Sequence, residues 1–103
     1  MTYSPSWKDK NTDFLVSALL SLENDDEVYR LLEDLCTISE IKAMAQRMAV
    51  ARLLENNTTY NSIAASTGAS TATVSRVKRC LNYGADGYKT VLRKMNEENS
   101  NEK

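Results

Sequence analysis

The stretch that decides the fold reads Tyr60-Asn-Ser-Ile-Ala-Ala-Ser-Thr-Gly-Ala-Ser-Thr-Ala-Thr-Val-Ser-Arg-Val-Lys-Arg79. This pattern predicts two short helices joined by a tight turn. Gly68 falls where the turn needs a positive φ, and Ser70 is a good N-cap for the second helix. Val74 and Val77 lie three residues apart, so they are expected to anchor that helix to a core. These features together are typical of a helix-turn-helix.

The first helix of this motif is expected to begin after Thr59, whose hydroxyl caps it, because Asn56-Asn-Thr-Thr59 interrupts the preceding helical pattern. Ile63 and Ala64 are predicted to face the core. A small side chain at position 64 would let the two helices cross closely. The motif therefore spans residues 59–81.

Hydroxyl and basic side chains occupy the open face of the second helix. These are the residue types that contact base edges and phosphates in DNA. A helical hairpin used only for packing could show the same polar face, but no Asp or Glu occurs between Asn56 and Ala85, and this charge context favours DNA binding. The predicted DNA-binding residues are Ser70, Thr71, Thr73, Ser75, Arg76, Lys78 and Arg79.

Charge is distributed unevenly along the chain, although the net charge is only −1. Residues 1–41 hold three basic and nine acidic side chains, whereas residues 42–95 hold nine basic and two acidic ones. Residues 96–103 hold one basic and three acidic side chains. We therefore expect one acidic surface kept away from nucleic acid and one basic surface offered to it.

Several functional classes are disfavoured by the residues that are missing. The sequence has no histidine, no glycine-rich phosphate loop and no serine-elbow motif, so an enzyme, a metal site and a cofactor are not expected. Cys36 and Cys80 are isolated and fit buried small hydrophobic positions rather than a disulfide framework. No apolar run is long enough for a membrane span, and no signal segment opens the chain, so a cytoplasmic location is predicted.

Apolar spacing predicts an all-α fold of six helices. The clearest pattern places Val28, Leu31, Leu32 and Leu35 at i, i+3, i+4 and i+7. A helix over 41–55 is apolar around much of its circumference, which is typical of a central helix buried on two sides. The expected organisation is an arm at 1–10, one domain at 11–96, and a disordered tail at 97–103.

A homodimer is predicted from two observations. The apolar surface of the first two helices exceeds what a thin layer of a 103-residue chain can cover, unless those helices fold back on the central one. One recognition helix with three cations also offers few phosphate contacts, whereas a two-fold dimer places paired helices in successive major grooves.

The chain resembles the Trp repressor superfamily, specifically the TrpR-related YerC/YecD proteins of Gram-positive bacteria. The resemblance covers roughly residues 19–95 and is most specific in Thr37-Ile-Ser-Glu-Ile-Lys-Ala-Met-Ala-Gln-Arg47 and in Thr67-Gly-Ala-Ser-Thr-Ala-Thr-Val-Ser-Arg76. It implies an intertwined homodimer with interlocking amino-terminal helices. It also implies a sequence-specific transcription regulator, expected to be a repressor, that binds double-stranded operator DNA.

The resemblance also implies where an effector would bind. In the tryptophan-responsive repressor, two arginines flank the indole ring and a threonine lines the same pocket. Thr37, Arg47 and Arg76 match these positions. This chain departs from the pattern at Val77, where the tryptophan-responsive protein has a glycine that leaves room for the ligand. A branched side chain fills that space, so tryptophan is not the expected corepressor.

Two alternatives remain beside the tryptophan-independent regulator. The first is a metabolite-sensing repressor with an amino-acid pocket near Arg47 and Arg76, whose small-molecule effector is unidentified. The second is a helical protein-protein interaction module, which would need an apolar stripe on the open face of the motif. Thr, Ser, Arg and Lys occupy that face instead.

Overall fold

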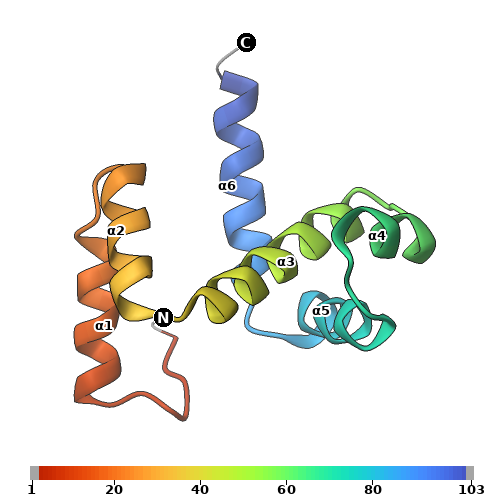
Figure 1. Cartoon of the computed structure of the whole chain (residues 1–103). Coiled ribbons are helices and arrows are strands. Elements are labelled where there is room, and N and C mark those ends of the chain that lie inside the picture. The colour runs from red at the N-terminus through yellow and green to blue at the C-terminus, as the bar shows by residue number, and fades with distance from the viewer. Residues whose placement is uncertain (1–2, 102–103) are drawn as a thin grey trace. The chain divides into compact units, whose positions relative to one another are not determined.

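A computed structural model describes residues 3–101, and within that range the chain forms six helices and no strand (Figure 1). The predicted all-α, six-helix fold is therefore confirmed. The chain divides into two compact units, Met1–Thr37 and Ile38–Lys103, where the sequence led us to expect one domain over 11–96. The helices are α1 Lys10–Leu20, α2 Asp25–Leu35, α3 Ile38–Glu55, α4 Tyr60–Thr67, α5 Thr71–Tyr83 and α6 Gly87–Asn101.

The first unit is built from α1 and α2, each of which begins at a side-chain cap. Asn24 caps α2 by accepting a hydrogen bond from the backbone N–H of Glu27 at 2.9 Å. Neither helix contains a buried residue. Phe14 and Leu20 of α1 are 77% and 80% exposed. This unit therefore leaves large apolar side chains uncovered.

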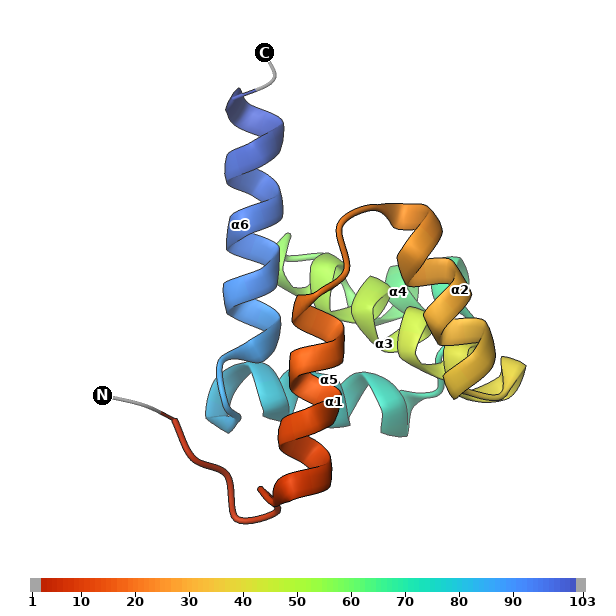
Figure 2. The same cartoon turned by 90° about the vertical axis from the view of Figure 1, so that its left-hand side faces the viewer.

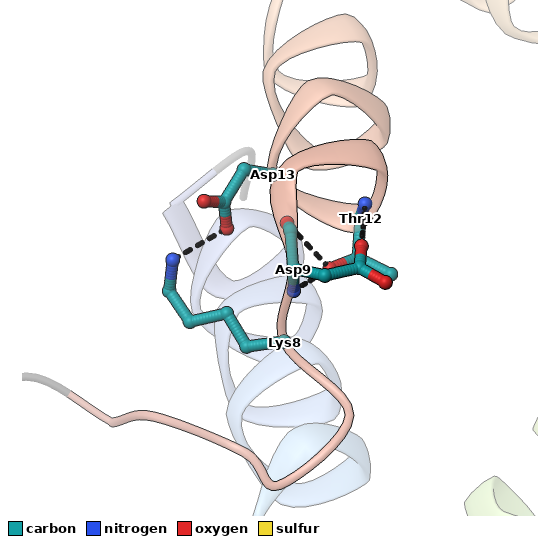
Figure 3. Close-up of polar contacts among 4 residues, drawn as sticks. All are labelled: Lys8, Asp9, Thr12 and Asp13. Atoms are coloured by element: carbon teal, nitrogen blue, oxygen red, sulfur yellow. Dashed lines mark hydrogen bonds and ion pairs between the residues drawn. The ribbon is translucent and has the colours of Figure 1, made fainter.

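A capping box starts α1 (Figure 3). Asp9 Oδ1 accepts from the backbone N–H of Thr12 at 2.7 Å, and Thr12 Oγ1 accepts from the backbone N–H of Asp9 at 2.8 Å. An ion pair of 2.6 Å joins Lys8 Nζ to Asp13 Oδ1 beside it. The hydrogen bonds from Thr12, first from its backbone and then from its side chain, lower the pKa of the Asp9 carboxyl. The ionised cap thus favours the folded start of α1.

Replacing Asp9 with alanine should shorten α1 and reduce helical circular dichroism at pH 6. Because the folded pKa lies below the unfolded value near 3.8, the ionised cap stabilises α1 above that pH and is lost as the pH falls through the folded pKa. Asp9→Asn is the matched control, since asparagine caps well without titrating. It should keep the helix at pH 6 and remove this part of the acid dependence between pH 5 and 2.5. Equal helicity for Asp9→Ala and the unmodified protein at pH 6 would contradict the assigned cap.

The second unit packs around α3, which contacts α4, α5 and α6 (Figures 1 and 2). The core of this unit contains only apolar side chains. The 18-residue α3 contributes Val50 and Ala51 to this core, on the side that faces the shorter helices. α6 leaves this core and extends away from it in both views. The buried residues are Val50, Ala51, Ile63, Ala69, Val74, Val77, Leu81 and Leu92.

Three details differ from the predictions. The tail expected at 97–103 is helical as far as Asn101, since no glycine or proline interrupts it and Arg93 Nε lies 3.9 Å from Glu97 Oε1 one turn later; residues 102–103 lie outside the described range. Both cysteines are free thiols, and neither is buried as expected: Cys36 is half-buried, and Cys80 is exposed because it lies beside the core-facing stripe of α5. Ala64 is exposed as well.

Between residues 3 and 101, no helix combines the length and the apolar character needed to cross a bilayer.

Candidate nucleic-acid interface

The helix α4 is fixed at its start by a side-chain cap, and at its end by a left-handed turn and a hydrogen bond from α3. Thr59 caps it by accepting from the backbone N–H of Ser62 at 3.3 Å. At the other end Gly68 has a φ of 73°, the left-handed conformation that its position predicts. Gln46 of α3 donates to the backbone oxygen of Thr67 at 3.2 Å and so ties this end to the central helix.

Residues 68–70 join α4 to α5. Ala69 in this connection is 5% exposed and belongs to the core, whereas Ala64, which we expected in the core, is exposed. The reason is geometric, because the left-handed turn at Gly68 directs the next residue inwards. On α4 itself, Ile63 is the one buried residue, and its side chain is fully buried.

The helix α5 begins at a second cap and is held by an apolar stripe. Ser70 Oγ accepts from the backbone N–H of Thr73 and donates to Thr73 Oγ1, each at 3.1 Å. Val74 and Val77 are 1% exposed, which confirms both as core anchors. Leu81 continues the same stripe one turn later. This packing fixes which face of α5 is turned away from the core.

Polar side chains cover the open face of α5. Six of the seven predicted contact residues are exposed, and Thr73 is half-buried beside the cap. Within residues 3–101, none of the three cations on this helix forms an ion pair with a carboxylate. An ordered helix surface thus carries three uncompensated positive charges. The exposed residues are Ser70, Thr71, Ser75, Arg76, Lys78 and Arg79.

One contact on this surface was not predicted. The ammonium of Lys78 lies 5.4 Å from the centroid of the Tyr60 ring, so a cation–π contact joins α5 to the start of α4. The two residues are 18 positions apart, and no helical or turn spacing relates them. Only the packing of one helix on the other brings them together.

The residues of the predicted effector pocket lie in different parts of the chain. Arg47 is half-buried on α3 and Arg76 is exposed on α5, both in the second unit, whereas Thr37 is the last residue of the first unit. Within residues 3–101 neither arginine forms a side-chain hydrogen bond or an ion pair. A pocket of about 450 Å³ in the second unit is lined by other residues, among them Met48, Cys80 and Tyr88.

With this geometry established, the chain can be compared with known proteins. Residues 10–96 match the family model described as Trp repressor protein. The chain belongs to this family. Uncharacterized protein YerC of Bacillus subtilis (strain 168) is 53% identical over 88 residues, which span 85% of each chain. The resemblance deduced from the two motif segments is therefore confirmed.

Two solved structures of the same kind are similar along most of their length. A candidate Trp repressor from Staphylococcus aureus superposes with a TM-score of 0.84 at 45% identity, covering 86% of this chain and 89% of that one. A TrpR-like protein from Eubacterium eligens ATCC 27750 also gives 0.84, at 49% identity, with 86% and 92% covered. The all-α fold is thus the fold of Trp repressor relatives. That family consists of DNA-binding transcription regulators rather than enzymes.

Proposed function

We propose that this Trp repressor family member is a cytoplasmic, sequence-specific repressor that binds operator DNA as a homodimer and does not respond to tryptophan. In this proposal α4 and α5 form a helix-turn-helix, with α5 as the recognition helix in the major groove. The observation that carries it is the rigid, carboxylate-free surface of α5. Its three cations have no carboxylate partner in the described chain, and the buried Val74 and Val77 hold the helix on the core.

The proposed contacts follow from position on α5. Of the seven predicted contact residues, helical spacing places Ser75, Arg76 and Arg79 farthest from the buried stripe, so these three extend most directly towards a ligand. In the proposal Thr71, Thr73, Ser75 and Arg76 lie near base edges, and Lys78 and Arg79 meet phosphates. Ser70 orders the start of the helix, where exposed backbone N–H groups favour another phosphate.

The homodimer is supported by the apolar side chains that remain uncovered. α1 and α2 bury no residue, and large apolar side chains of both are exposed. Monomeric soluble proteins rarely leave contiguous apolar patches of such width in water. A second copy that covers them also supplies a second α5, and so doubles the cationic contacts with one duplex. In the proposal the two chains interlock through their amino-terminal helices.

The proposal is tested by measuring affinity for a mixed-sequence 30-bp duplex as a function of salt. Two chains, each with Lys78 and Arg79 on phosphates, should give a slope of log K against log salt of about −4. Light scattering of the same complex should give the mass of two chains on one duplex. Binding that is weak and insensitive to salt would contradict the proposed interface.

Tryptophan should leave the melting temperature of the protein unchanged. Val77 is 1% exposed and packs within the core, and in the proposal its branched side chain occupies the space beside Arg76 that an indole ring would need. The measurement is thermal unfolding with tryptophan at increasing concentrations, beside a panel of other amino acids. A tryptophan-dependent rise would overturn this inference, because a ligand that binds only the folded state raises its stability. A rise with another amino acid would favour a metabolite-sensing repressor.

A further inference from the structure

Tyr60 is the one aromatic residue between positions 3 and 101 whose ring contacts a cation. It is the first residue of α4, it is 39% exposed, and its ring centroid lies 5.4 Å from Nζ of Lys78 on α5. That distance is within the range in which the negative face of an aromatic ring attracts an ammonium. The contact therefore restrains the end of a long side chain at the surface proposed to bind DNA.

The kind of contact matters for the charge of Lys78. A carboxylate partner would neutralise the ammonium and occupy its N–H donors. An aromatic ring holds the ammonium by its quadrupole, so the full positive charge and the N–H donors remain free for an anion. No carboxylate competes nearby in sequence, because residues 56–85 contain none. Lys78 is thus both ordered and available.

We propose that Tyr60 is a positioning residue for DNA binding, which holds the Lys78 ammonium in place to meet a phosphate of the duplex. The proposal rests on the function proposed above and adds a residue outside the recognition helix to it. Arg76 and Arg79 have no aromatic partner within residues 3–101. Lys78 is therefore the cation of α5 whose position depends on α4. A substitution in α4 that moves the Lys78 ammonium should alter the affinity for DNA.

The competing explanation is structural, since the Tyr60 ring could simply cover the aliphatic stem of Lys78 and stabilise the two helices. A double-mutant cycle separates the two roles. The variants are Tyr60→Leu, Lys78→Met and the double substitution, with Tyr60→Phe as the conservative variant that keeps the ring face. Tyr83→Leu is the matched control, because Tyr83 is 85% exposed on α5 and contacts no cation in the described chain.

Affinity for a mixed-sequence 30-bp duplex at low salt is the measurement. Tyr60→Leu should weaken binding roughly two- to fivefold for each chain, hence about 4- to 25-fold where two chains hold one duplex. Tyr60→Phe and Tyr83→Leu should bind like the unmodified protein. Lys78→Met should reduce the salt slope by about 0.9 for each chain, and in that background Tyr60→Leu should cost nothing more.

The outcomes separate this proposal from the one on which it rests. If the unmodified protein binds no duplex, both the proposed function and the positioning role of Tyr60 are contradicted. An unmodified protein that binds with the expected salt dependence, but loses equal affinity on Tyr60→Leu with and without Lys78, would overturn the positioning role alone. A lowered melting temperature with such additive losses would assign Tyr60 to the stability of α4.

Discussion

Charge reversal at Arg76 and Arg79 should abolish DNA binding while the protein stays folded and keeps its oligomeric state. Both side chains are exposed on α5 and have no carboxylate partner in the described chain, so their replacement by glutamate breaks no internal ion pair. A dimer would lose four cationic contacts and gain four charges that repel phosphate. With charge-assisted contacts of about 1.5–3 kcal/mol each, the loss of affinity should reach at least the order of a thousandfold.

A matched control separates the position of the charge from its amount. Lys10→Glu combined with Lys94→Glu changes the net charge by the same amount at two exposed lysines outside α3, α4 and α5. This control should change affinity far less than the α5 variant, at the same salt concentration. Comparable losses in the two proteins would show that overall charge, rather than the α5 surface, governs binding. Size-exclusion chromatography of both variants should show the same elution volume as the unmodified protein.

Replacing Ile63 with alanine should destabilise the second unit by about 2–5 kcal/mol. Ile63 is fully buried among the side chains that hold α4 and α5 on α3. With only eight residues, α4 has too few turns to be stable in water without this packing. The free energy of unfolding, measured by urea denaturation at a fixed protein concentration, should fall accordingly. DNA binding should weaken with it, because α5 packs against α4.

Two variants calibrate the Ile63 result. Ile63→Val removes one methylene group and should cost about 0.5–1.5 kcal/mol. Ala64→Ser lies one residue further along α4 on the exposed side and should stay within about 0.5 kcal/mol of the unmodified protein. A similar loss for Ala64→Ser and Ile63→Ala would contradict the assigned packing face of α4.

Local signals explain why much of this surface could be predicted from sequence. The caps at Thr59 and Ser70, the positive φ at Gly68 and the burial of Val74 and Val77 each depend on a few neighbouring residues. Such features are determined mainly by hydrogen-bonding capacity, backbone freedom and helical spacing. They place the open face of α5 almost without reference to the rest of the chain.

Features set by packing between helices could not be read in the same way. Spacing within α4 alone did not reveal that the chain turns Ala69 inwards and leaves Ala64 in water. The contact of Tyr60 with Lys78 depends on how α4 lies on α5, which no local pattern encodes. Cys80 lies at the edge of the apolar stripe of α5, beside a pocket that residues of α6 also line. Its exposure therefore depends on how closely α6 packs against this edge of α5.

Selection of bound sequences from a library of random duplexes tests the central claim most directly. A homodimer with two α5 helices should enrich a roughly palindromic site whose half-sites lie about one helical turn, or a multiple of it, apart. The same selection with the Arg76→Glu, Arg79→Glu variant should enrich no site. Failure of the unmodified protein to enrich any sequence, together with weak binding that salt does not affect, would contradict the assignment of α5 as a DNA-reading helix.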